Sequence, residues 1–263
     1  MKNSGFFSRT NTMLKVDFRR MFTIPFFYIL VGISLVVPIL ILVMTSMMDG
    51  TVSVDPQTKE ETVMKGFDFV WQILGATSSA GMSTDMSLTS MCNINMMYFA
   101  IAVLVCIFVS DDFRSGYSKN LFTVRAKKTD YVISKTFVCF VGAAIMFIMF
   151  FVGAMIGGAI SKVPYDMIGF NIGNLVACMM SKLFLSLIFV AVCVLASVVG
   201  KSKAWMSLIL SFGFGMLFFT MIPMISPLDS TILNVIMSFG GGVLFAIGMG
   251  AISNVVLKKT SLV

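Results

Sequence analysis

Long apolar runs with few or no charged residues are the dominant pattern along this chain. About 20 consecutive apolar residues span the hydrocarbon core of a bilayer as a helix. Each run is too long for a buried strand, and the polar alternation of a membrane barrel is missing. The pattern therefore predicts an all-α fold with six transmembrane helices, at residues 24–48, 91–110, 136–160, 174–200, 204–225 and 231–257.

Composition supports this reading and excludes a soluble protein. Hydrophobic residues make up 58% of the 263 residues and charged residues 12%, against about 25% charged in an ordinary globular chain. So few charges could not cover the surface of a soluble protein of this size. We expect a polytopic membrane protein that forms one integral domain over residues 1–263, with a cytoplasmic segment at 1–23, an extracellular loop at 49–90 and a cytoplasmic loop at 111–135.

The charges between the predicted helices set the orientation. With the N-terminus in the cytoplasm, 15 of the 19 Lys and Arg residues lie inside and 8 of the 12 acidic residues lie outside. Cytoplasmic loops carry an excess of Lys and Arg, so this asymmetry predicts that both termini are cytoplasmic. The net charge of +7 is then a result of topology and gives no specific support for nucleic-acid binding.

The segment before the first span has the pattern of an amphipathic helix. Its apolar residues follow helical spacing, and its basic residues fall largely on the other side. The apolar positions are Leu14, Phe18, Met21 and Phe22, and the basic positions are Lys15, Arg19 and Arg20. We expect an interfacial helix in the inner headgroup layer, the alternative being a plain cytosolic stub.

The cytoplasmic loop at 111–135 is the only one between spans that is long enough to hold a folded element. Phe113, Tyr117 and Leu121 are four residues apart, so they would line one helix face. Such a stripe suits a short helix that docks on a soluble partner, whereas a solvated basic turn would not need it.

No catalytic or nucleotide-binding motif is found in the sequence. Histidine is absent, which removes most hydrolytic triads and the commonest transition-metal sites. Gly200, Lys201 and Ser202 resemble the tail of a phosphate-binding loop, but position 195 is leucine where that motif needs glycine. We therefore expect no enzyme activity, cofactor or metal in this chain itself.

Lys182 is the one charge within a predicted span. It lies 18 residues before Gly200, about 27 Å from the inner end of that helix, and therefore near the outer membrane boundary. We expect it to snorkel to water there, with a position facing a transport pathway as the alternative.

Two patterns concern packing on the outer side and between helices. Within the outer loop, apolar residues at helical spacing predict an amphipathic helix; they are Val63, Phe67, Val70, Trp71 and Leu74. Gly153 and Gly157 form a GxxxG motif that allows close helix packing.

The five cysteines are interpreted as small apolar packing residues, and a disulfide between Cys92 and Cys178 is left open.

Residues of the second cytoplasmic segment carry a family resemblance. Asp112 precedes Gly116 by four residues, and Lys135 follows Lys128 by seven. With the layout of six spans, this resembles the membrane subunit of a type-two ABC exporter, although Lys128 stands in place of the usual arginine. Arg125 also replaces a frequent proline. The pair Lys119–Asn120 is similar to the bacitracin and lantibiotic resistance permeases of Gram-positive bacteria, and Ser226–Pro227 resembles the family's turn before the last span.

The resemblance implies a multi-pass permease of a bacterial plasma membrane that exports an amphipathic or hydrophobic substrate, such as a peptide antibiotic, a lipid-linked molecule or a drug. It also implies pairing with a second permease subunit and with a cytosolic ATPase that binds ATP and magnesium. The residues it would place at the ATPase contact are Asp112, Phe113, Gly116, Tyr117, Lys119, Asn120, Leu121, Arg125, Lys128, Lys201 and Lys203.

Other functions remain open from the sequence. The main alternative is an ATP-independent membrane transporter or channel, although no charge or helix break lies near the midplane of the spans. A membrane-embedded enzyme would need paired acids or histidines in the spans, which the sequence lacks. A membrane anchor or sensor subunit is the third alternative.

Overall fold

The computed structural model describes residues 6–54, 61–63, 66–76, 93–123, 127–219 and 225–259. Within them the fold is helical except for one short antiparallel hairpin, β1 (Val52–Val54) with β2 (Glu61–Val63). The α-helices are α1 (Phe6–Thr23), α2 (Pro25–Met48), α4 (Met97–Arg114), α5 (Tyr117–Thr123), α6 (Lys128–Ser161), α7 (Ile172–Gly200), α8 (Ala204–Phe219) and α10 (Ile232–Lys259). The described residues also include two 3-10 turns, η1 (Val70–Ile73) and η3 (Ile94–Met96).

Five of these helices are long and apolar enough to cross a membrane: α2, α4 together with η3, α6, α7 and α10. The helical class predicted from the hydrophobic runs is therefore confirmed, and the length and composition of these five helices suit a membrane-embedded protein. The remaining predicted span, at residues 204–225, corresponds in its described part to α8, an apolar helix of 16 residues. Helix α6 begins at Lys128, eight residues before the span predicted at residues 136–160. Residues 128–135, which are more polar than the apolar run, thus form the first part of the same helix.

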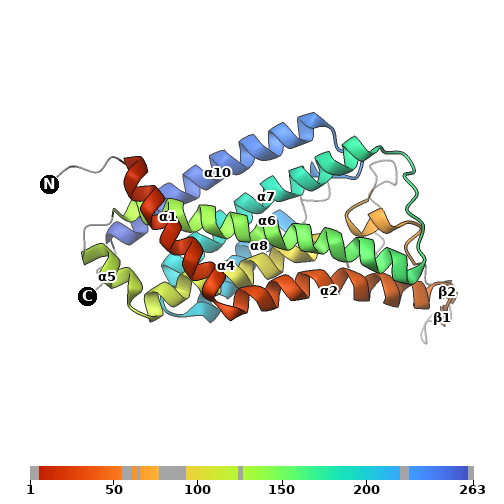
Figure 1. Cartoon of the computed structure of the whole chain (residues 1–263), viewed down its shortest axis with the longest axis horizontal. Coiled ribbons are helices and arrows are strands. Elements are labelled where there is room, and N and C mark those ends of the chain that lie inside the picture. Colours follow the sequence, from red (N-terminus) through yellow and green to blue (C-terminus); the bar gives the residue numbers. More distant parts are fainter. Residues whose placement is uncertain are drawn as a thin grey trace.

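The long helices run side by side and give the molecule two distinct ends (Figure 1). One end, called the α5 end below, carries α5, the start of α1 and the last turn of α10; the other, the hairpin end, carries β1 and β2. Helix α2 packs along α6, and α10 packs along α7. Helices α4 and α7 are the most buried of the long helices, and α10 is the most exposed.

The GxxxG motif lies in the contact between α2 and α6. A Cβ atom on Gly157 would lie 2.9 Å from the Cα atom of Ile39, and one on Gly153 would overlap the Leu35 carbonyl. Real side chains do not approach so closely, so only glycine permits this spacing of the two backbones. The motif therefore packs two helices of the same chain.

The predicted amphipathic helix in the outer loop is wrong. Val63 belongs to strand β2, and among the described residues of the outer loop only the four of η1 are helical. The apolar residues Phe67, Val70, Trp71 and Leu74 are buried nonetheless, and the segment also hydrogen-bonds to the loop after α6. The Val70 amide donates to the Pro164 carbonyl at 3.0 Å, and the Trp71 indole donates to the Tyr165 carbonyl at 3.1 Å.

Candidate functional site

Four charged side chains meet in the interior at the α5 end and are called the charge cluster below: Asp17, Arg20, Asp112 and Lys135. The Lys135 ammonium lies 2.8 Å from Asp17 Oδ1 and 2.7 Å from Asp112 Oδ2. The other oxygen of Asp112, Oδ1, accepts from Arg20 Nη1 at 2.5 Å. Two positive and two negative charges make the cluster neutral.

The cluster is enclosed by polar and aromatic neighbours. The side chains of Asp17, Asp112 and Lys135 are fully buried. Tyr131 donates its hydroxyl to Asp112 Oδ2 at 2.9 Å, and Ser134 donates to Asp17 Oδ2 at 2.6 Å. Buried charges are tolerated when they are paired and their polar atoms find partners. Both carboxylates are paired and accept a hydrogen bond, and Lys135 is held by its ion pairs to both of them.

Aromatic rings cover both cations of the cluster. The Arg20 guanidinium carbon lies 4.0 Å from the centre of the Tyr117 ring, and the Lys135 ammonium lies 4.1 Å from the centre of the Phe108 ring. Both distances are within the range of a cation–π interaction. The cations are therefore held by aromatic faces as well as by carboxylates.

The cluster joins helices that are far apart in the sequence. Asp17 and Arg20 belong to α1, Asp112 to the last turn of α4, and Lys135 to the second turn of α6. Gly116, with φ of +74°, makes the turn between α4 and α5, a left-handed conformation that favours glycine. This turn directs α5 so that Tyr117 at its start reaches Arg20.

Charge and burial shift the ionisation of two groups in this region. Burial lowers the pKa of Arg20, but the charge of Asp112, followed by Tyr117 and Asp17, more than offsets that effect and raises the pKa above its ordinary value. Burial and the Asp17 charge raise the pKa of Tyr117, against the opposing charges of Lys135 and Arg20. Both groups therefore keep their protons at neutral pH.

The predicted aromatic stripe is divided by the turn at Gly116. Phe113 lies on α4, whereas Tyr117 and Leu121 lie on α5. Phe113 and Leu121 pack partly buried against the hydrophobic core, so the stripe faces inward and does not form one free helix face. The role of these residues in partner binding remains a prediction.

The polar residues of the predicted contact are those that face outward. Lys119, Asn120, Lys201 and Lys203 are exposed, whereas Asp112 is buried in the charge cluster. The turn 201–203 lies at the α5 end beside the end of α4, because Ser110 of α4 shares a hydrogen bond of 3.2 Å with Ser207 of α8.

Lys128 and Arg125 also belong to the predicted ATPase contact. Lys128 donates from Nζ to the Leu257 carbonyl at 2.6 Å, which connects the start of α6 to the last turn of α10. Arg125 lies outside the described residues.

Lys182 forms a second buried polar site, near the hairpin end. Its ammonium lies 3.2 Å from Asn95 Oδ1 and 3.1 Å from Ser226 Oγ, and its side chain is fully buried. The expectation that Lys182 snorkels to water is wrong, because η3 and the segment before α10 cover the side chain. A role in a transport pathway remains a prediction.

The cysteines were expected to be packing residues, with a disulfide between Cys92 and Cys178 left open. Cys178 has a free thiol that donates to the Ser226 carbonyl at 3.5 Å, and Cys92 lies outside the described residues. In the part of the chain that the structure describes, no group of three His, Cys, Asp or Glu side chains could hold a metal ion.

Sequence reasoning placed Arg20 on the basic face of α1 and missed Asp17. A signal for Asp17 was present: it is the only acid among the first 48 residues, and it lies four residues from both Met13 and Met21. All three side chains are buried on one face of α1.

No family model, curated protein or solved structure matches the chain, so support for a function comes from its own residues.

Proposed function

We propose that this chain is the transmembrane subunit of an ATP-driven ABC exporter that moves an amphipathic or hydrophobic substrate across a bacterial plasma membrane. The charge cluster is the observation that carries this proposal. It connects α1, α4 and α6 at the point where α5 turns away from α4. A force applied to α5 by a partner would thus reach three helices together, which is what an externally energised transporter requires.

The proposal includes a six-span topology. In it, the predicted span at residues 204–225, which begins with α8, is an additional membrane crossing beside the five long helices, the α5 end faces the cytoplasm, and α1 lies in the inner headgroup layer. The exposed lysines 119, 127, 201, 203, 258 and 259 support this orientation, since positive charge collects on the cytoplasmic side. The exposed apolar faces of α8 and α10 would contact lipid or a second permease subunit.

The proposal also divides the work between subunits. A separate cytosolic ATPase would bind ATP and magnesium and would contact the exposed side of α5 and the turn 201–203. A short helix and an adjacent turn at one end of a bundle form a compact docking site for such a protein. This chain would supply the pathway and the coupling contact.

Charge reversal on α5 tests the docking surface. Lys119→Glu changes an exposed side chain, so it should leave the fold intact while reducing recovery of the ATPase about fivefold or more, the effect of losing a central interface contact. Recovery is measured by purifying the tagged chain from native membranes in mild detergent. Lys162→Glu is the matched control, because Lys162 is equally an exposed lysine but lies just after α6, at the other end of the bundle.

Equal recovery of the ATPase with both variants would contradict the proposed docking surface. If no ATPase co-purifies even with the unchanged chain, the exporter proposal itself fails. An ATP-independent membrane transporter or channel would then be favoured, with buried Lys182 as the first residue to examine, because ionisable groups inside a bundle mark transport pathways.

A further inference from the structure

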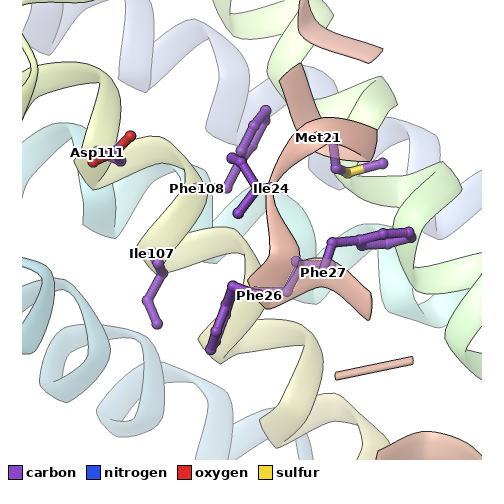
Figure 2. Close-up of a pocket in the computed structure, with 8 residues that line it drawn as sticks. Met21, Ile24, Phe26, Phe27, Ile107, Phe108 and Asp111 are labelled. Atoms are coloured by element: carbon purple, nitrogen blue, oxygen red, sulfur yellow. The ribbon is translucent and has the colours of Figure 1, made fainter. Parts of the chain in front are cut away.

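An apolar cavity of about 190 Å³ lies between the α1–α2 connection and α4. Its walls come from Met21, Ile24, Phe26 and Phe27 on one side and from Leu104, Ile107 and Phe108 on the other, with Asp111 as the only charged residue. Figure 2 shows the apolar side chains around the middle of the cavity and Asp111 further along α4, at its edge.

From the length of α4 we infer that the cavity lies where hydrocarbon meets headgroups. Asp111 is in the last turn of α4, and a spanning helix of about 20 residues places its last turn at the membrane boundary. The apolar walls belong to the two preceding turns of α4, to the end of α1 and to the start of α2. A molecule in this cavity would therefore have its apolar part in the hydrocarbon and its polar part beside Asp111.

Asp111 differs from the other acids of this end. Asp17 and Asp112 are paired in the charge cluster, and Asp130 accepts from Arg9 at 3.1 Å. Within the described residues, Asp111 has no ion-pair partner. Arg114, three residues along the same helix and exposed, has none there either. Two opposite charges on neighbouring positions of one helix thus remain available to a ligand.

We propose that this cavity binds a zwitterionic aminophospholipid. An acyl chain occupies the apolar walls, the lipid ammonium pairs with Asp111, and the lipid phosphate pairs with Arg114. An anionic lipid without an amine fits less well, because it gives Asp111 no cation. The site needs only a membrane-embedded chain, so this proposal does not depend on the exporter function, and either can fail alone.

Competition between two lipids tests the proposal. The purified full chain is exposed to equal amounts of phosphatidylethanolamine and phosphatidylglycerol with the same acyl chains, and the bound lipids are counted by native mass spectrometry. We expect about a two- to fivefold preference for phosphatidylethanolamine, the range given by one partly exposed ion pair. Asp111→Asn should bring the ratio close to one. Asp166→Asn, at an exposed aspartate just after α6 at the hairpin end, should leave it unchanged.

Two further measurements keep the test decisive if Asp111→Asn fails to fold. With the unchanged protein, phosphatidylethanolamine whose amine is acetylated should lose its preference, because the phosphate remains but the cation is gone. Ile107→Trp should fill the cavity and reduce binding of both lipids. Equal binding of the two lipids by the unchanged chain, or a preference that survives acetylation of the amine, would overturn the proposal.

Discussion

At the scale of single residues, Lys135 holds the charge cluster together, because it lies between two buried carboxylates. It lies within 2.8 Å of Asp17 and 2.7 Å of Asp112. Removing one partner of a buried ion pair typically costs about 3–5 kcal/mol, since it leaves a buried charge without compensation. We predict that Lys135→Met lowers the free energy of unfolding by about this amount, measured by thermal unfolding in detergent.

A double variant distinguishes charge balance from lost packing. Lys135→Met with Asp17→Asn removes one charge of each sign and leaves Asp112 paired with Arg20. We expect it to be more stable than Lys135→Met alone. If the second substitution instead adds further destabilisation, neutrality is not what holds the cluster together.

Tyr117 provides a prediction about pH. The folded state raises its pKa through burial and the Asp17 charge, whereas the unfolded chain has the ordinary value of about 10. Above pH 10 the unfolded state therefore binds fewer protons than the folded state, and stability falls as the pH rises. The unfolding temperature of Tyr117→Phe should decrease less between pH 9 and 11 than that of the unchanged chain. Equal decreases would show that Tyr117 does not contribute.

At the scale of elements, Lys128 connects α6 to the C-terminal turn of α10. Its ammonium donates to the Leu257 carbonyl at 2.6 Å, and carbonyls at a helix C-terminus otherwise lack partners within the helix. Lys128→Met should therefore speed hydrogen exchange in the last turn of α10 and leave α2 unchanged. The neighbouring Lys127 is exposed, so Lys127→Met should have little effect. Similar exchange in both variants would rule out this connection.

The sequence predicts most long helices to within a few residues, because their apolar runs are read directly. The prediction of a helix in the outer loop was wrong because the same apolar positions can be buried in two ways. They can line one face of a helix, or they can lie in a non-helical segment that hydrogen-bonds to another loop. The prediction that Lys182 snorkels was wrong because the position of a residue along its own helix does not show which neighbouring segments cover its side chain. The charge cluster needs three helices that are distant in sequence, so no local pattern could reveal its pairing.

At the scale of the whole molecule, the orientation of α8 determines the topology. If α8 crosses the membrane, residues 201–203 are cytoplasmic and the segment before α10 is outside. Alkaline phosphatase, which is active only outside the cytoplasm, should be active when fused after Asp229 and inactive when fused after Lys203. Green fluorescent protein, which fluoresces inside, should give the opposite pattern. Inactive phosphatase at both positions would mean that α8 does not cross.

The central claim is that an external ATPase drives this membrane subunit, and ATP hydrolysis by the isolated complex tests it most directly. The tagged chain is purified in mild detergent from its native membranes, and separately after expression alone. We predict that the native preparation contains a soluble ATPase subunit and hydrolyses magnesium-ATP, while the chain expressed alone does not. An intact chain from native membranes with neither an ATPase subunit nor hydrolysis would contradict the claim.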